Sequence, residues 1–262
     1  MKLTEQQILD NWETFRKNIN TLFPEKSDAL NVLYDEMSER ICMMPASGVE
    51  YYHNAFAGGY VDHVLRVAKC AETLYNTWKS MGADMSGYTL NELLFAAYHH
   101  DLGKVGFPGE GNENYIPNDS EWHRKNQGKI YTHNPKLPFS LVPDLSIYLL
   151  QSYNVPISWN EFLAIRIHDG MYDDANKAYF LSRSKDAKLR TNMQVILHHA
   201  DHMAAMIEYD KVKTDTNISV TPTNTSISKK HRLQKLESVA SNPAQPAPDK
   251  DLTSMFTELF GD

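Results

Sequence analysis

The most informative stretch of the sequence is residues 93–104, which read Leu-Leu-Phe-Ala-Ala-Tyr-His-His-Asp-Leu-Gly-Lys. Its first half is apolar at nearly every position, which predicts a helix that is buried on all sides. Thr89 can cap the start of this helix, and Gly103 is a plausible terminator. The helix leads directly into His100 and Asp101, and imidazole and carboxylate groups are common ligands of divalent metals. The stretch therefore predicts a central helix that ends at a metal site.

The regions on either side of this stretch predict further helices and few strands. Upstream, residues 1–45 predict an N-terminal helical pair packed on the core, and residues 60–81 predict one long helix. Downstream, the spacing of apolar residues predicts helices that begin near Pro143, Ser158 and Leu189. The expected fold class is therefore all-α.

Composition divides the chain into three parts. Residues 46–210 form the main helical domain, which follows the helical pair of residues 1–45. Within it, residues 105–137 make a polar connection whose length is usually a sign of function. Residues 129–132 can form one arm of a β-hairpin in that connection. Residues 211–262 are rich in Thr and then in Pro, which predicts a flexible tail.

The overall composition excludes several classes of protein. The chain has 262 residues and a formal net charge of −7, which argues against broad binding of nucleic acid through clustered Lys and Arg. Cys42 and Cys70 are the only cysteines, so neither a disulfide framework nor a cysteine zinc site is expected. The N-terminus lacks the pattern of a signal peptide, and no apolar run reaches the length of a membrane span. We therefore expect a protein of the cytoplasm with no membrane partner.

Two residues far from the central stretch are candidates for the same metal site. His63 lies in the first turn of the helix predicted for residues 60–81. Asp201 lies inside the last predicted helix, which is otherwise largely apolar on that side, and a buried carboxylate needs a partner. We therefore expect His63 and Asp201 to converge with His100 and Asp101 on one metal ion.

The order of these elements resembles a known family. Four segments carry the resemblance, and they are residues 53–63 (His-Asn-Ala-Phe-Ala-Gly-Gly-Tyr-Val-Asp-His), 100–104 (His-Asp-Leu-Gly-Lys), 168–170 (His-Asp-Gly) and 198–201 (His-His-Ala-Asp). Together they resemble the HD-domain superfamily of metal-dependent phosphohydrolases, over roughly residues 50–210. The Gly-Gly-x-x-x-His element resembles the branch of bacterial HD-type 3′–5′ exoribonucleases, and similar proteins occur in large tailed phages. The resemblance implies an HD-domain helical bundle, in the cytoplasm of a bacterial host if the chain is phage-encoded.

The resemblance also implies a set of metal ligands. The ligands of the first metal match His63, His100, Asp101 and Asp201. Members with two metals add two further histidines, and His168 matches the second of these. The first falls by position at Asp144, a carboxylate where the family usually has His, and nearby His133 is the competing candidate. The implied cofactor is therefore one or two divalent ions, among Mn, Fe, Zn, Mg and Ni.

The same resemblance suggests how a phosphoester would be hydrolysed. Asp101 would ligate the metal and help to orient the attacking water, and Lys104 would neutralise a phosphate oxygen in the transition state. His53 and Lys129 are candidates for substrate binding, and Arg166 is another possible phosphate contact. The expected substrate is a phosphoester of a nucleotide or nucleic acid. Two alternatives stay open, an HD-fold di-iron oxygenase and a metal-binding module without catalysis.

The end of the chain suggests a partner. Residues 251–260 read Asp-Leu-Thr-Ser-Met-Phe-Thr-Glu-Leu-Phe and follow a Pro-rich stretch. They resemble the short peptides with which replication proteins bind a sliding clamp, where a few apolar side chains anchor a disordered tail. The alternative is a helix that folds back on the domain. A sliding clamp is thus an expected partner.

Overall fold

A computed structural model of the protein describes residues 2–50, 52–182, 184, 186 and 188–216. The expected tail beyond residue 216, with the apolar peptide of residues 251–260, lies outside the described residues. The elements of the described part are α1 (Glu5–Leu22), α2 (Ser27–Glu36), α3 (Ser38–Met43), α4 (Gly59–Ser80), α5 (Leu90–His99), the 3-10 helix η1 (Leu102–Val105), β1 (Tyr115–Pro117), α6 (Glu121–Gln127), β2 (Tyr131–His133), α7 (Val142–Ser152), α8 (Trp159–Arg166), the 3-10 helices η2 (Gly170–Tyr172) and η3 (Asp174–Asn176), α9 (Lys177–Phe180) and α10 (Met193–Thr216).

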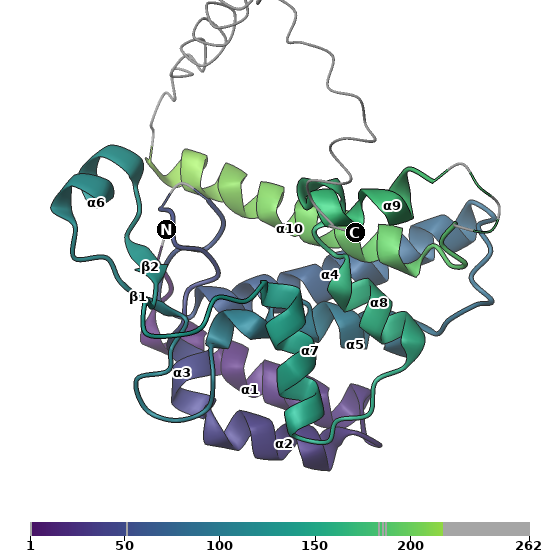
Figure 1. Ribbon diagram of the computed structural model, residues 1–262, viewed down its shortest axis with the longest axis horizontal. Coiled ribbons are helices and arrows are strands. Elements are labelled where there is room, and N and C mark those ends of the chain that lie inside the picture. Colours follow the sequence, from purple (N-terminus) through teal and green to yellow (C-terminus); the bar gives the residue numbers. More distant parts are fainter. Residues whose placement is uncertain (1, 51, 183, 185, 187, 217–262) are drawn as a thin grey trace, which may run out of the picture. The chain divides into compact units, whose positions relative to one another are not determined.

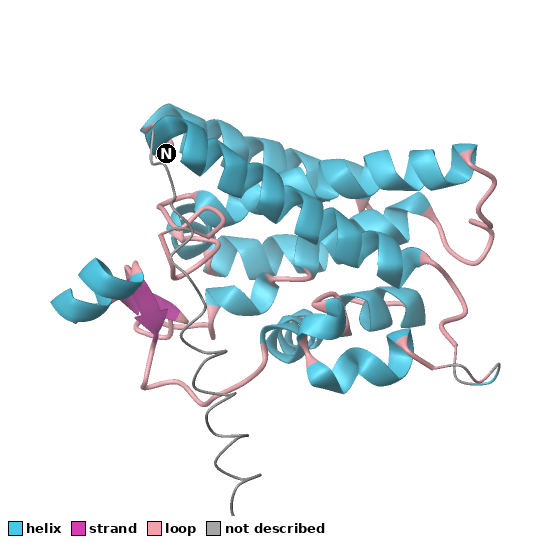
Figure 2. Ribbon diagram, turned by 90° about the horizontal axis from the view of Figure 1, so that it is seen from above, coloured by secondary structure: helices cyan, strands magenta, loops and turns pink. Residues whose placement is uncertain are grey.

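The prediction of an all-α fold is confirmed. Helices make up most of the described chain, and its one sheet is the antiparallel pair β1 and β2 (Figures 1 and 2). Helix α5 is central, since it packs against α4, α8 and α10, while α4 and α10 also pack along each other. The side chains of residues 93–99 are all buried, as the apolar run predicts. The end of α5 is therefore enclosed by the other long helices of the bundle.

Helix ends are fixed where the sequence offers caps. Thr4, Thr89 and Ser158 each accept a hydrogen bond in a capping box at the start of α1, α5 and α8. At the other end of α5 the prediction needs a correction, because Gly103 does not end the helix in a left-handed conformation. It lies in η1, where a Cβ atom would be 2.2 Å from the carbonyl oxygen of Val142. Gly103 thus permits close packing of η1 on α7.

The N-terminal helices enclose an aromatic core. The rings of Phe15 and Tyr34 meet edge to face at 5.1 Å, and Phe15 also packs on Tyr98 of α5 at 5.4 Å. The ring of Phe23 also meets the rings of Phe95 and Tyr98 edge to face, with centroids 5.4 and 5.7 Å apart. The second helix of the predicted pair is interrupted at Met37, so that α2 and the short α3 replace one continuous helix. This core lies between α5 and the N-terminal helices α1 and α2.

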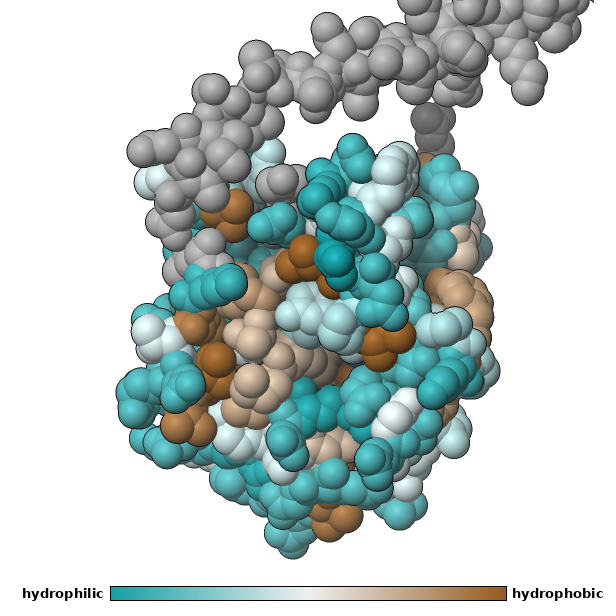
Figure 3. Space-filling view, turned by 90° about the vertical axis from the view of Figure 1, so that its left-hand side faces the viewer, coloured by the Kyte–Doolittle hydropathy of each residue, from teal (hydrophilic) through white to brown (hydrophobic). Residues whose placement is uncertain are grey.

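The long polar connection forms a projecting arm. β1 pairs with β2 in an antiparallel register that places Tyr115 opposite His133, and α6 lies between the two strands in the sequence. Figures 1 and 2 show this arm at the edge of the helical body. The side of the molecule that bears the arm faces the viewer in Figure 3, where polar side chains surround a group of moderately apolar ones. Among the described residues, no helix is both long and apolar enough to cross a membrane.

Candidate metal centre

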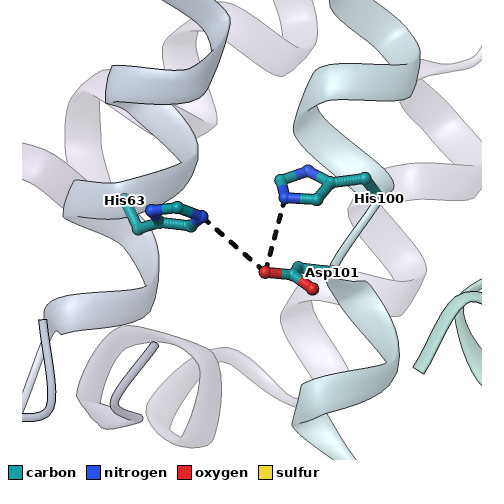
Figure 4. Close-up of side chains that lie close together, drawn as sticks. All are labelled: His63, His100 and Asp101. Atoms are coloured by element: carbon teal, nitrogen blue, oxygen red, sulfur yellow. Dashed lines mark ion pairs between the residues drawn. The ribbon is translucent and has the colours of Figure 1, made fainter. Parts of the chain in front are cut away.

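Five predicted ligands come together from four parts of the bundle. His63 comes from α4, His100 and Asp101 from the end of α5, His168 from the turn after α8, and Asp201 from the middle of α10. His63, His100 and Asp101 each offer one ligand atom, and these atoms lie within 4.8 Å of one another. The same is true of His100, His168 and Asp201. Figure 4 shows His63 and His100 pointing from separate helices toward the Asp101 carboxylate.

The Nε2 atoms of the three histidines face the two carboxylates. His63 Nε2 lies 3.1 Å from Asp201 Oδ1 and 3.7 Å from Asp101 Oδ2. His100 Nε2 lies 3.4 Å from Asp101 Oδ2 and 3.8 Å from Asp201 Oδ1. His168 Nε2 approaches the other oxygen of Asp101, Oδ1, at 3.7 Å. Asp101 therefore presents one oxygen to His63 and His100 and its second oxygen to His168.

The Nδ1 atoms of the same rings are bound to acceptors. His100 Nδ1 is 2.9 Å from the Ala97 carbonyl oxygen, and His168 Nδ1 is 2.8 Å from that of Ile165. A carbonyl oxygen only accepts hydrogen bonds, so Nδ1 carries the proton and Nε2 of the neutral ring holds a lone pair. This outer hydrogen bond is the usual way to orient a metal-binding imidazole. Both rings are thus held with a ligand atom toward the centre.

The donor set fits a divalent cation. Nε2 of His63 and of His100 is buried and has no hydrogen-bond partner. A buried polar atom without a partner is costly, and these two atoms face the carboxylate oxygens of Asp201 and Asp101. A cation between them would satisfy the imidazole lone pairs and the carboxylate charges together. Three imidazole nitrogens with two carboxylates are a ligand set suited to Zn, Mn or Fe.

The electrostatics keep the carboxylates ionised. Burial alone would raise the pKa of Asp101, but Lys104, His100 and His168 hold it well below its usual value. Burial would likewise lower the pKa of His63, yet the neighbouring Glu208 and Asp201 carboxylates raise it to about 10. Without a metal, a proton on His63 therefore compensates the negative charge of the cluster. A divalent cation would compensate the same charge when bound.

Sequence reasoning did not find Glu208, which supports His63 from outside the cluster. The Glu208 side chain is 1% exposed, and its two oxygens lie 3.1 and 3.2 Å from His63 Nδ1. Arg66 Nε donates to Glu208 at 3.0 Å. The available signal was the helical spacing, because Glu208 follows Asp201 by two turns on the same face of α10. An acidic residue on that face is expected to be buried once Asp201 is placed in the cluster.

Two of the residues predicted for catalysis and substrate binding lie next to the cluster. Lys104 Nζ is 2.5 Å from Asp101 Oδ2, and the lysine side chain is only 12% exposed. The ring of His53 stacks on that of His63, with centroids 4.8 Å apart. Burial, with the nearby charge of Lys104, lowers the pKa of His53 to about 3, so this ring is neutral near pH 7. The structure thus places one cation and one neutral imidazole beside the predicted ligands.

The structure does not bring the other candidates into the cluster. Asp144 belongs to neither ligand group, and its Oδ1 forms an ion pair with Arg166 Nε at 2.7 Å. His133 also stays outside, since it is exposed in β2 and stacks on Tyr115 at 5.2 Å. Lys129 is exposed just before β2. The sequence left Asp144 and His133 as alternative ligands of a second metal, and neither joins His168 in this structure.

Behind the ligands, His198 and Gly170 shape the turn that carries His168. His198 Nδ1 donates to the carbonyl oxygen of His168 at 2.8 Å. Gly170 has a φ of +57°, and a Cβ atom there would lie 2.4 Å from the His198 ring. The His-Asp-Gly sequence at 168–170 therefore requires glycine at its last position. His198 therefore supports the position of His168 through a backbone hydrogen bond.

A comparison with protein families independently supports the interpretation of this cluster as a metal centre. The family model described as the HD domain matches residues 60–206, which is more than half of the chain and includes all five residues of the cluster. The chain belongs to the HD-domain family. Most HD-domain proteins are metal-dependent phosphohydrolases, which agrees with the ligand set described above. Searches of curated proteins and of solved structures found no match to this HD-domain protein.

Proposed function

We propose that this HD-domain protein hydrolyses a phosphoester of a nucleotide or nucleic acid with the help of a divalent cation. The main support is the convergence of three oriented Nε2 atoms and two carboxylates beside Lys104. A cation bound there would activate water and neutralise phosphoryl charge. The other catalytic roles are assigned to side chains of the protein.

Asp101 and Lys104 have the central roles in this proposal. Both oxygens of the Asp101 carboxylate face the cluster. Because each oxygen has more than one lone pair, Asp101 can also accept a hydrogen bond from a water molecule aligned for attack. Its ion pair with Lys104 fixes the ammonium group at the edge of the cluster. A fixed cation in a partly dry site stabilises negative charge that develops on a phosphoryl group better than a mobile surface lysine does. This buried lysine favours an anionic substrate over activation of dioxygen.

A cavity next to Lys104 supports a substrate of nucleotide size. It has a volume of about 710 Å³, and Lys104, Tyr115, Tyr131 and Met44 are among its lining residues. Binding pockets for small molecules commonly have volumes of about 300–1,000 Å³. Tyrosine rings and a methionine side chain suit the flat face of a nucleobase. Lys104 connects this cavity to the predicted ligands, which do not themselves line it.

The proposal is tested with purified protein reloaded with Mn, Fe, Zn, Mg or Ni. Phosphate or nucleotide release is measured with nucleoside triphosphates, cyclic nucleotides and short oligonucleotides. We expect metal-dependent hydrolysis of at least one class, and strong loss of the rate in Lys104→Met. Lys125→Met is the matched control, because Lys125 pairs with Glu121 on exposed α6. Oxygen uptake by the iron-loaded protein without any phosphoester hydrolysis would instead support the oxygenase alternative.

We also propose that residues 251–260 bind a sliding clamp, although they lie outside the described residues. The support is the sequence alone, in which Leu252, Met255, Phe256 and Leu259 provide apolar anchors after a Pro-rich stretch. Deletion of residues 250–262 should abolish retention on an immobilised clamp and leave hydrolysis of a small substrate unchanged. Equal retention of the full and shortened chains would rule the proposal out.

A further inference from the structure

The cavity beside Lys104 differs in charge between its buried wall and its exposed wall. Lys104 is only 12% exposed and pairs with Asp101, so it marks the wall that adjoins the metal cluster. Three other lining residues, Glu36, Glu39 and Glu110, are exposed and mark the wall that opens to solvent. A substrate that reaches Lys104 from solvent through this opening therefore passes a group of carboxylates.

The second basic residue among the described lining residues, Arg40, is already bound to the protein. Its Nη1 donates to the carbonyl oxygen of Phe107 at 2.6 Å, and its Nη2 donates to that of Gly109 at 2.6 Å. The same Nη2 lies 3.7 Å from Oε1 of Glu113, a fourth carboxylate of the lining. Arg40 thus fastens the loop around Phe107 and Gly109 to α3, and it does little to offset the carboxylates at the opening.

Two of the exposed carboxylates keep their full charge at the opening. Within the part of the chain that the structure describes, neither Glu39, in the first turn of α3, nor Glu110, in the loop after η1, forms an ion pair. A sphere with the cavity's volume of about 710 Å³ is about 11 Å across, which is close to the Debye length of about 8–10 Å. Charges on the exposed wall therefore act on a ligand anywhere in the opening, and a cleft lined by one sign of charge repels ligands of that sign.

We propose that the substrate is a free mononucleotide rather than a nucleic-acid strand, and that Glu39 and Glu110 select it by repelling the phosphates of a longer chain. This inference rests on the proposed function, because it names the substrate class of the same site. The phosphate of a mononucleotide lies at Lys104, and its nucleoside lies in the cavity. The further phosphates of a strand lie at the acidic opening, where repulsion between like charges raises the free energy of the complex. The carboxylates themselves bind no ligand.

The first measurement compares kcat/KM of the Mn²⁺-loaded wild type for nucleoside 5′- and 3′-monophosphates and for dinucleotides and tetranucleotides of the same base. We expect the tetranucleotide to be hydrolysed at least about tenfold less efficiently than the better monophosphate, because each added phosphate increases the repulsion. Raising the salt concentration from about 0.1 M to about 1 M should narrow this difference, since the Debye length shortens from about 10 Å to about 3 Å. A kcat/KM for the tetranucleotide that equals or exceeds that for the monophosphate would overturn the inference.

The second measurement tests whether the two carboxylates cause the preference. In the double variant Glu39→Gln/Glu110→Gln we expect kcat/KM for the tetranucleotide to rise roughly threefold to tenfold, while that for the monophosphate changes by less than about twofold. The matched control is Glu13→Gln/Glu25→Gln, which removes the same net charge from two exposed residues that are not among the lining residues of the cavity. An equal gain in the control, or no gain in the first variant, would overturn the role of Glu39 and Glu110.

Two results separate this inference from the proposed function. Hydrolysis of the tetranucleotide at least as efficient as that of the monophosphate overturns the inference and leaves the function intact. If no substrate is hydrolysed, the proposed function is wrong, and the affinities of the same ligands for the Mn²⁺-loaded protein are then compared by calorimetry. Tighter binding of the monophosphate, with a smaller preference in Glu39→Gln/Glu110→Gln, would support the selection of mononucleotides without catalysis. Equal or tighter binding of the tetranucleotide would overturn it.

Discussion

His99 and His100 are neighbours at the end of α5, and both side chains are fully buried. His99 faces the aromatic core of the N-terminal helices, where its ring lies 4.2 Å from that of Phe95 and 6.2 Å from that of Tyr34. His100 faces the metal cluster on the other side of the helix end. In both rings Nδ1 donates to a backbone carbonyl oxygen of the same helix, and Nε2 has no hydrogen-bond partner.

The difference between these two environments is the presence of carboxylates. Burial by itself lowers the pKa of both rings. Beside His100, Asp101 and Asp201 overcome this effect and raise its pKa, whereas burial prevails at His99 and lowers its pKa to about 3. A buried imidazole with an unpaired nitrogen is therefore not sufficient evidence of a ligand. The anions that face the nitrogen distinguish the metal side of α5 from the aromatic side.

Replacement of His100 should produce the largest effect. We expect His100→Ala to lower the rate of hydrolysis by roughly 10³-fold or more, because it removes a metal ligand and with it the electrostatic stabilisation of the transition state. The same variant should bind Mn²⁺ far more weakly in a calorimetric titration. Its neighbour provides the control, since His99→Gln should retain the wild-type Mn²⁺ content. Equal metal binding by His100→Ala and the wild type would contradict the distinction between the two sides.

Replacement of His99 by alanine should act on stability instead. The ring fills space among Phe23, Phe95 and Tyr34, so its removal leaves a cavity in the aromatic core. We expect His99→Ala to lower the free energy of unfolding by roughly 2 to 3 kcal/mol. Denaturant unfolding measures this change, and metal content after reloading should stay at the wild-type value. A stable His99→Ala protein that had lost its metal would reverse the assignment of the two residues.

The pH dependence of stability should also reveal His99. Its pKa is about 6.5 in the unfolded chain and about 3 in the fold, so protonation favours unfolding. The contribution of neutral His99 is complete above pH 6.5 and is lost progressively as the pH falls toward 3. Between pH 7.5 and pH 5 we expect the wild type to lose about 2 kcal/mol more than His99→Gln. Denaturant unfolding of both proteins is measured with a chelator present, so that metal release does not contribute. Parallel plots of the free energy of unfolding against pH would refute the prediction.

The sequence predicted the centre of the site better than its surroundings. His63, His100, Asp101, His168 and Asp201 were predicted together because their motifs follow one another along the chain in the order of the resemblance, and the structure brings these side chains together. The partner of Asp144 left no such pattern, since the choice between a metal and Arg166 depends on how α7 and α8 pack.

The fold shows the same division between local and long-range information. The apolar run of residues 93–99 predicted a central helix, and the capping boxes at Thr4, Thr89 and Ser158 fixed three helix starts. The break at Met37 and the arm between β1 and β2 were less accessible, because both depend on tertiary packing that overrides local preference. Gly103 was predicted as a helix terminator, but glycine is needed there because a Cβ atom would clash with the carbonyl oxygen of Val142 in α7. This contact between distant parts of the chain is not visible in the local sequence.

The smallest expected effect is that of replacing Glu208, which lies behind His63 at the edge of the metal cluster. Glu208 is the carboxylate behind His63, whereas no carboxylate of the described residues is paired with the His99 ring. We expect Glu208→Gln to weaken Mn²⁺ binding by about tenfold, because partners that orient a metal-binding histidine typically contribute 10- to 100-fold. The amide oxygen can still accept from His63 Nδ1, which keeps the effect below that of losing a ligand. Arg66 retains its ion pair with Asp62 inside α4, and α4 still packs along α10 through the rest of the interface.

The measurement for Glu208→Gln is a competition titration of Mn²⁺ against a chelator of known affinity. Glu72→Gln is the matched control on α4, since Glu72 is partly exposed and pairs only with the neighbouring Lys69 among the described contacts. Near-identical Mn²⁺ affinity in Glu208→Gln and Glu72→Gln would show that the charge behind His63 has no influence on the metal. In that case the anions that separate the two sides of α5 would be limited to Asp101 and Asp201. A tenfold difference would extend the metal side of the bundle along α10, two helical turns beyond Asp201.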